Sequence, residues 1–156
     1  MFNILKNLIN LNSVVLAKVQ RDRLYDEADA LFRAGRHKEA FPLMKQASDL
    51  GSEHATVQMA MMFLRGQGTA CDWVSAAECL ELAIARGIPN VHINLGLVYG
   101  VGGYGLKRNP EKAEYYLVQA IAVDNDGEAE QMLAMLRKKQ APFGGKENPR
   151  PKIPWQ

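Results

Sequence analysis

The sequence predicts an all-α fold, a right-handed α-solenoid of antiparallel helix hairpins with a capping helix at each end. Two observations lead to this prediction. A pattern of apolar and small residues at helical spacing recurs every 36 or 37 residues, a period typical of helical repeat proteins. Glycine-rich stretches separate the two helices of each full unit, because glycine breaks a helix and permits a tight turn.

The clearest unit spans residues 91–124. Gly96 and Tyr99 share one face of its first helix, and a run of glycines over 100–105 ends that helix. Asn109 suits the N-cap of the second helix, because its side chain accepts hydrogen bonds from free backbone N–H groups. We expect Gly96 to lie where the two helices meet, so that a larger side chain there would overpack the contact.

The same pattern recurs on both sides of this unit. Going back 36 residues, Ala60 stands at the position of Gly96, and Phe63 stands at that of Tyr99. A hairpin with a shorter loop comes before, and a single first helix without a partner comes after. We expect this last helix to cap the array, with its outer side facing water. These two further segments are residues 24–51 and 128–139.

The order of these residues resembles the Sel-one-like repeat family, a relative of the tetratricopeptide repeats. The matching residues are Ala55, Gly66, Gly68, Asp72, Ala76, Ala83 and Gly87, and then Leu95, Gly96, Tyr99, Lys112, Ala113 and Ala120. The departures are Ala60 for glycine, Thr69 for valine, Ser75 for lysine, and Cys79 and Tyr116 for tryptophan. The resemblance covers about residues 24–136. It implies a hairpin solenoid and a scaffold or adaptor function, whereas the fold alone does not identify a partner.

Three parts are expected along the chain: an N-terminal capping helix over 1–23, a repeat domain over 24–140 and a proline-rich extended tail over 141–156. The first part has an apolar stripe at helical spacing, which we expect to pack on the open end of the first repeat. An interfacial membrane helix is the alternative. Polar residues interrupt the segment too often for a membrane span or a signal peptide. The stripe consists of Ile4, Leu8, Leu11, Val15 and Val19.

The charge is unevenly distributed along the chain. The formal net charge is +2, with +3 in residues 1–23 and +5 in residues 137–156, which leaves −6 between them. The basic ends lack the interleaved aromatic residues of nucleic-acid-binding segments, so no nucleic-acid partner is expected. The prolines of the tail exclude a helix. Because the tail ends in Ile153 and Trp155, it is either a disordered end or an anchor.

No catalytic, cofactor or metal site is predicted. Cys71 and Cys79 lie about 10 Å apart along one helix, too far for a disulfide, so we expect reduced cysteines and a cytoplasmic protein. A lowered pKa of Cys71 near the helix N-terminus leaves a redox role open. The three histidines lack the spacing of metal ligands, and the glycine run lacks the Gly-Lys-Ser/Thr of a phosphate loop.

The expected function is non-catalytic binding of another protein or a peptide segment through the concave surface, which the first helices line in tetratricopeptide-like solenoids. The alternative is an immunity or inhibitor protein that neutralises a bacterial effector toxin. The oligomeric state is not predicted. The expected partner-binding row has an apolar middle and basic ends, and consists of Arg33, Val57, Met61, Leu64, Arg65, Ile93, Leu97, Val101, Met135 and Lys138.

Another interpretation of this row remains open. The same apolar side chains could be ordinary core residues covered by the N-terminal helix. If they are exposed instead, the tail could occupy the groove when no partner is bound, with Trp155 as its plug. Met61 and its neighbour Met62 would supply the adaptable contacts typical of peptide grooves.

Overall fold

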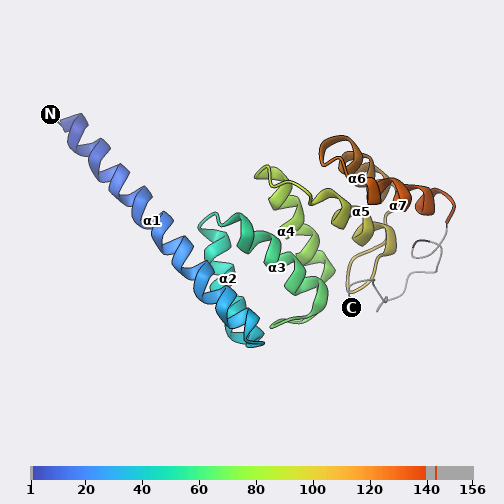
Figure 1. Ribbon diagram of the computed structural model, residues 1–156, viewed down its shortest axis with the longest axis horizontal. Helices are drawn as coiled ribbons and strands as arrows, with labels where there is room; N and C mark the ends of the chain where they lie inside the picture. Colours follow the sequence, from blue (N-terminus) through green and yellow to red (C-terminus); the bar gives the residue numbers. More distant parts are fainter. Residues whose placement is uncertain (1, 140–142, 144–156) are drawn as a thin grey trace.

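The computed structural model describes residues 2–139 and Phe143, with side chains from Leu11 onwards. In this part of the chain there are seven helices and no strands, and the helices follow one another as antiparallel neighbours (Figure 1). The all-α prediction is therefore confirmed. The helices are α1 Phe2–Arg33, α2 His37–Asp49, α3 Glu53–Arg65, α4 Trp73–Ala85, α5 His92–Val101, α6 Pro110–Val123 and α7 Gly127–Arg137.

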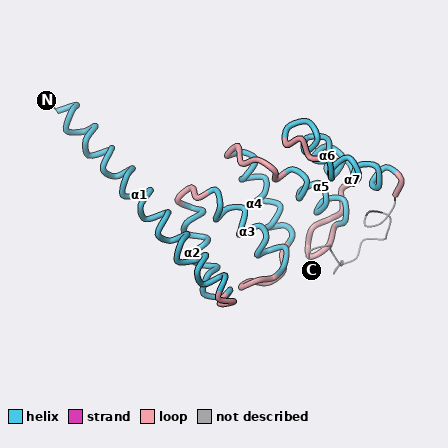
Figure 2. The backbone as a smooth tube through the Cα atoms, viewed as in Figure 1, coloured by secondary structure: helices cyan, strands magenta, loops and turns pink. Residues whose placement is uncertain are grey.

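Three hairpins form the body of the molecule. The helix α1 packs on α2, α3 on α4 and α5 on α6, and successive hairpins meet through the pairs α2–α3 and α4–α5. Longer connections over 66–72 and 102–109 join the helices of the second and third hairpins, as Figure 2 shows. These are the two glycine-rich stretches of the sequence, so the repeat of the sequence corresponds to the repeat of the structure.

Side-chain caps fix where several helices begin. Asn109 accepts a hydrogen bond from the backbone N–H of Lys112 at 2.8 Å, as the sequence predicted. At the equivalent position of the second hairpin, Asp72 accepts from the backbone N–H groups of Val74 and Ser75. These bonds satisfy backbone donors that have no partner within the helix.

The contact between α5 and α6 depends on Gly96. A Cβ atom at this position would lie 2.6 Å from Cγ of Leu117, closer than real Cβ contacts come. The prediction that Gly96 marks the meeting point of the two helices is therefore confirmed. The absence of a side chain lets the helix backbones approach each other closely.

Each glycine loop also contacts the hairpin before it. Gly68 has a φ of +77°, and a Cβ there would lie 2.1 Å from the carbonyl oxygen of His37, at the start of α2. Gly105 in the next loop has a φ of +88°, and its Cβ would lie 3.6 Å from Cγ2 of Val74, at the start of α4. The loops thus help to join neighbouring hairpins, and Gly68 allows the closer of the two contacts.

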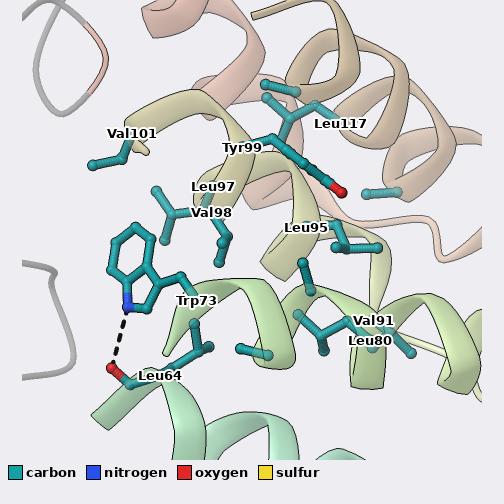
Figure 3. Packing of buried hydrophobic residues seen from close by; sticks show 14 of the residues in the cluster. Leu64, Trp73, Leu80, Val91, Leu95, Leu97, Val98, Tyr99, Val101 and Leu117 are labelled. Atoms are coloured by element: carbon teal, nitrogen blue, oxygen red, sulfur yellow. Dashed lines mark hydrogen bonds between the residues drawn. The ribbon is translucent and has the colours of Figure 1, made fainter. Parts of the chain in front are cut away.

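Two hydrophobic clusters stabilise the array. The larger one joins α3 to α7 and includes Trp73, whose fully buried indole Nε1 donates a hydrogen bond to the carbonyl oxygen of Leu64 at 3.3 Å (Figure 3). The smaller one joins α1, α2 and α3 around Met44, Met59 and Met62. Methionine side chains adapt to irregular spaces, which suits the packing of this first hairpin.

A polar network lies between the first two hairpins. The hydroxyl groups of Ser48 and Thr56 are 2.8 Å apart, and Thr56 also donates to the carbonyl oxygen of Ser52. Arg86, just after α4, donates to the Thr56 hydroxyl at 2.6 Å and to the Ser48 carbonyl at 3.2 Å. A residue of the second hairpin thereby holds the end of α2 and the start of α3.

The N-terminal helix differs from the expected cap. The chain forms one continuous helix from Phe2 to Arg33, with no break near residue 23, and every described side chain from 11 to 20 is exposed. The described residues of the stripe that was predicted to cover the first repeat, Leu11, Val15 and Val19, therefore do not pack on it. The reason is visible in Figure 1, where the N-terminal half of α1 extends away from the stacked hairpins.

The C-terminal helix occupies the position predicted for a cap. The helix α7 packs on α6 and α5, and it buries Ala129, Leu133 and Leu136 against them. Arg137 stays exposed and forms an ion pair with Glu114 of α6, at 2.7 Å between Nη2 and Oε1. The tail prediction falls outside the described residues, Phe143 excepted.

Candidate interaction surface

The structure divides the predicted partner-binding row into a buried and an exposed part. Leu64, Leu97 and Val101 are only 0%, 1% and 8% exposed, and all three belong to the larger cluster. They cannot touch a partner in this structure, so their assignment to a binding surface is corrected. Figure 3 shows the reason, because Leu97 and Leu64 both lie near Trp73 between two hairpins rather than in an open groove.

The other apolar members of the row are half-buried. Val57 and Met61 on α3, Ile93 on α5 and Met135 on α7 pack partly against the larger cluster. Each therefore has one side on the core while another part of it reaches solvent. The N-terminal helix does not cover them, because its described contacts are with α2 and with the smaller cluster.

The basic members of the row are exposed. Arg33 forms an ion pair with Asp29, one turn earlier on α1, at 2.9 Å. Among the described residues, neither Arg65 nor Lys138 takes part in a salt bridge. Arg65 follows Met61 by four residues on α3, and Lys138 follows Met135 by three at the end of α7. Both spacings put the cation beside the half-buried methionine.

Four polar side chains that the sequence analysis did not assign to a surface converge between α4, α5 and α6. The hydroxyl groups of Tyr99 and Tyr116 donate to Oε1 of Glu81 at 2.9 and 3.2 Å, and their rings stack with centroids 5.9 Å apart. Lys112 lies over the Tyr99 ring, 4.5 Å from its centroid, and donates to its hydroxyl. The sequence did not identify Glu81 as part of this group, because its position in the repeat does not indicate a hydrogen-bond partner on the next hairpin.

These contacts keep the tyrosines protonated. Burial and the nearby Glu81 carboxylate raise the pKa of Tyr116, because both disfavour a phenolate. Burial likewise raises the pKa of Tyr99, although the hydrogen bond from Lys112 opposes the shift. The two hydroxyl groups therefore act as hydrogen-bond donors that fix the third hairpin on the second.

Phe143 shows where the chain goes after the last helix. Its side chain is 1% exposed, and a Cβ at Gly100 would lie 2.5 Å from its ring. Arg108 donates to the carbonyl oxygens of both Gly100 and Phe143. The sequence analysis named Trp155 as the anchor of the tail, and that residue lies outside the described part of the chain. The anchor that the structure shows is Phe143.

His92 has a structural contact. Its Nδ1 lies 2.7 Å from Oδ2 of Asp124, which joins the start of α5 to the end of α6. Burial of the Asp124 carboxyl opposes its ionisation, but the hydrogen bond with the His92 ring, together with backbone hydrogen bonds from Asn90 and His92, outweighs this effect and lowers the pKa of Asp124. Within the part of the chain that the structure describes, no group of three His, Cys, Asp or Glu residues is placed to hold a metal ion.

The cysteines are both free and partly buried. Burial raises the pKa of the Cys71 thiol, whose Sγ donates to the carbonyl oxygen of Leu64. The expectation of a lowered pKa at this helix N-terminus is therefore wrong, because burial, which disfavours the thiolate, is the largest effect on this group. Burial also raises the pKa of Cys79, to about 11. Neither thiol has the lowered pKa of a reactive cysteine.

Comparisons with known proteins agree with this architecture. No family model matches the chain. A relative in Arabidopsis thaliana, the ERAD-associated E3 ubiquitin-protein ligase component HRD3B, is 32% identical over 100 residues, which are 64% of this chain and 16% of the relative. HRD3A of the same plant is 32% identical over 89 residues, 57% of this chain and 13% of that protein. The chain thus spans about a sixth or less of these relatives.

Two solved structures show the same arrangement of helices. One is a protective antigen of uropathogenic Escherichia coli strains that displays an SLR fold, with a TM-score of 0.64, 22% identity and coverage of 81% of this chain and 27% of that chain. The other is a Sel1 repeat protein from Oxalobacter formigenes, with a TM-score of 0.59, 18% identity and coverage of 85% and 53%.

The stacked hairpins, with their glycine loops and terminal helix, define an α-helical repeat protein. The fold shared with these structures and the residues that recur in each unit define the class more narrowly. The chain is a helical-repeat protein with the Sel1-like repeat (SLR) fold. The resemblance found in the sequence is confirmed at the level of the fold. Among the described residues, no helix has the length and apolar character needed to cross a membrane.

Proposed function

We propose that this chain is a non-catalytic scaffold that binds another protein through the exposed remainder of the predicted row. The observation that carries the proposal is the pairing of a half-buried methionine with an exposed cation on two separate first helices, Met61 with Arg65 and Met135 with Lys138. An apolar side chain beside a cation suits a partner segment that has apolar and acidic residues on one face.

Two further points support a role in assembly. Sel1-like repeat proteins generally mediate protein–protein interaction, and an array of hairpins offers an extended surface for it. The Arabidopsis relatives are components of an E3 ubiquitin-protein ligase. The free, unreactive cysteines agree with a cytoplasmic location, which we include in the proposal.

The test is site-specific photocrosslinking in the cells that produce the protein. A photoreactive amino acid at Met61 should trap a partner that the same amino acid at Lys38, an exposed residue of α2, does not trap. The identity of the trapped protein also separates the adaptor from the alternative, because an effector toxin at this position would indicate an immunity protein.

Affinity measurements with the purified partner complete the test. Arg65→Glu combined with Lys138→Glu should weaken binding about tenfold, since both changes replace attraction to acidic groups by repulsion. Lys38→Glu is the matched control and should leave the affinity unchanged. A partner that crosslinks equally from both positions, or binds the double variant normally, would place the interaction elsewhere on the molecule.

A further inference from the structure

The large apolar side chains described in the N-terminal half of α1 are exposed. All described side chains from 11 to 20 are exposed, while the later part of the helix packs on α2 through residues such as Ala28. Figure 1 shows this half extending from the stack as a free helical arm. A polar arm would need no explanation, but this one carries several large apolar side chains.

Four of these side chains form what we call the α1 arc: Leu11, Val15, Leu16 and Val19. They are 61%, 52%, 68% and 58% exposed. At about 100° of rotation per residue, the four positions span about 140° of the helix circumference. Asn12 interrupts this arc between Val19 and Leu16, and Val14, 65% exposed, lies beyond it next to Lys18. Surfaces of monomeric soluble proteins seldom leave so many neighbouring large apolar side chains uncovered without a function.

The arc faces away from the repeat domain. Val19 and Ala28 are nine residues apart, which at about 100° per residue places them on opposite sides of the helix. Ala28 is fully buried in the first hairpin, so Val19 points away from the body. An extended surface could therefore contact the arc along its length without meeting the hairpins.

The charges of this segment indicate what kind of partner surface would bind the arc. The sequence has no Asp or Glu before Asp22, whereas Lys18 and Arg21 lie beside the arc. Arg21 pairs with Asp22 at 2.8 Å, and in the described part of the chain no ion pair involves Lys18. The segment therefore favours an anionic partner over a neutral one.

A second copy of this helix fits poorly. Helix pairs obtain their specificity from complementary charges beside a narrow apolar seam, whereas the charged side chains of residues 11–21, Lys18 and Arg21, are both positive. The arc is also wider than such a seam. A broad apolar face with cations at its border is instead typical of helices that lie in the plane of a membrane surface.

We propose that the α1 arc binds the surface of membranes that contain anionic lipids. The helix lies flat, with Val15 and Val19 among the acyl chains and Lys18 near the headgroups, and it holds the repeat domain on the side away from the lipid. This is peripheral attachment and not insertion, in agreement with the lack of a membrane-spanning helix in the described residues.

The test uses the full chain in flotation with phosphatidylcholine vesicles that contain about a third phosphatidylserine. The protein should float with these vesicles and bind pure phosphatidylcholine at least fivefold more weakly. Val15→Glu with Val19→Glu should abolish flotation, because it puts charges into the apolar face. Lys18→Glu should reduce binding about tenfold or more.

Ala17→Glu is the matched control. Ala17 is exposed and lies about 160–200° away from Val15 and Val19 around the helix, so the added charge faces water and costs at most the electrostatic part of binding. Circular dichroism checks that every variant keeps its helical fold. The proposal is overturned if the protein does not float, if the Val15/Val19 variant floats normally, or if sedimentation shows that the arc forms a dimer that excludes lipid.

Discussion

The second and third hairpins use equivalent repeat positions in different ways. In α5–α6, Gly96 lets the helices approach, and the ring of Tyr99 stacks on Tyr116 at an interplanar angle of 7°. In α3–α4, Ala60 fills the position of Gly96, and the ring of Phe63 lies edge-on to Phe41 of the hairpin before, with centroids 5.2 Å apart. Both arrangements keep the same overall fold.

This difference follows from the size of one side chain in the second helix of each hairpin, at the position of Tyr116 in α6 and Cys79 in α4. Tyr116 offers Tyr99 a ring within its own hairpin, whereas the equivalent residue in the second hairpin is Cys79, which is too small to do so. Phe63 packs instead against the first hairpin. The same repeat position therefore holds a hairpin together in one unit and joins neighbouring units in the other.

Removal of the aromatic rings should give the largest effect. Tyr99→Ala is expected to lower the free energy of unfolding by about 3–5 kcal/mol, since the ring is 7% exposed. Phe63→Ala should cost less, about 1–3 kcal/mol, because this ring is only half-buried. Urea denaturation measures both values, and Tyr99→Phe separates the ring from its hydroxyl, at about 1 kcal/mol. Equal costs for the two alanine variants would contradict the comparison.

Exchange of the small residues should give an intermediate effect. Gly96→Ala is expected to destabilise the protein by about 1–3 kcal/mol, because the new methyl group would collide with Leu117. This sign is informative, since alanine in place of glycine normally stabilises a helix by about 1 kcal/mol. Ala60→Gly in the other hairpin should cost about 1 kcal/mol through the same propensity. If thermal denaturation showed Gly96→Ala to be stabilising, the closer approach of α5 and α6 would be wrong.

Replacement of the N-cap residues Asp72 and Asn109 should give the smallest effect on stability, and for Asp72 this effect depends on pH. Burial opposes ionisation of Asp72, but hydrogen bonds from Ser75 and from two backbone N–H groups outweigh it and lower the pKa of Asp72. A carboxyl group with a lowered pKa in the folded state stabilises that state above its unfolded pKa of about 3.9, and this contribution is lost as the pH falls through the folded pKa. Asn109 does not titrate.

Asp72→Asn should therefore flatten the dependence of stability on pH below about pH 4. At pH 7 the loss should stay under about 1 kcal/mol, because asparagine also caps helices well. Stability curves measured between pH 2 and pH 7, with Asn109→Ala as an uncharged comparison, provide the test. An unchanged acid slope would show that Asp72 makes no net contribution through its charge.

The recurrence of residues predicted the parts of the structure that depend on local spacing. Gly96, Asp72 and Asn109 lie where the repeat placed them, because helix caps and close helix contacts need particular residue types at fixed distances along the chain. The site residues were harder to assign. A helix in a solenoid contacts its own hairpin and the neighbouring one, so two faces are buried, and the spacing of Leu64 and Leu97 does not distinguish the second buried face from an open one.

Two further features depend on contacts that the sequence does not encode locally. Phe143 packs against Gly100, far away along the chain, and a single aromatic residue between proline and glycine gives no sign of this contact. The apolar stripe of α1 was correctly placed on a helix, but periodicity cannot tell whether another element covers its residues, and Leu11, Val15 and Val19 are exposed. Spacing alone likewise cannot show whether the surface needed for partner binding is exposed.

The hydrogen bonds of Arg86 bear on how the protein unfolds. In a linear array, cooperativity comes from the interfaces between neighbouring units and not from the units themselves. Arg86 and Thr56 both belong to the second hairpin, and both bond to Ser48 on the other side of the first interface, Arg86 to its carbonyl oxygen and Thr56 to its hydroxyl. Opening of the first hairpin alone would break both bonds of Ser48 to the second hairpin. We therefore expect the two hairpins to unfold together, so that amide hydrogen exchange in α2 reports the global opening of the chain instead of a local one.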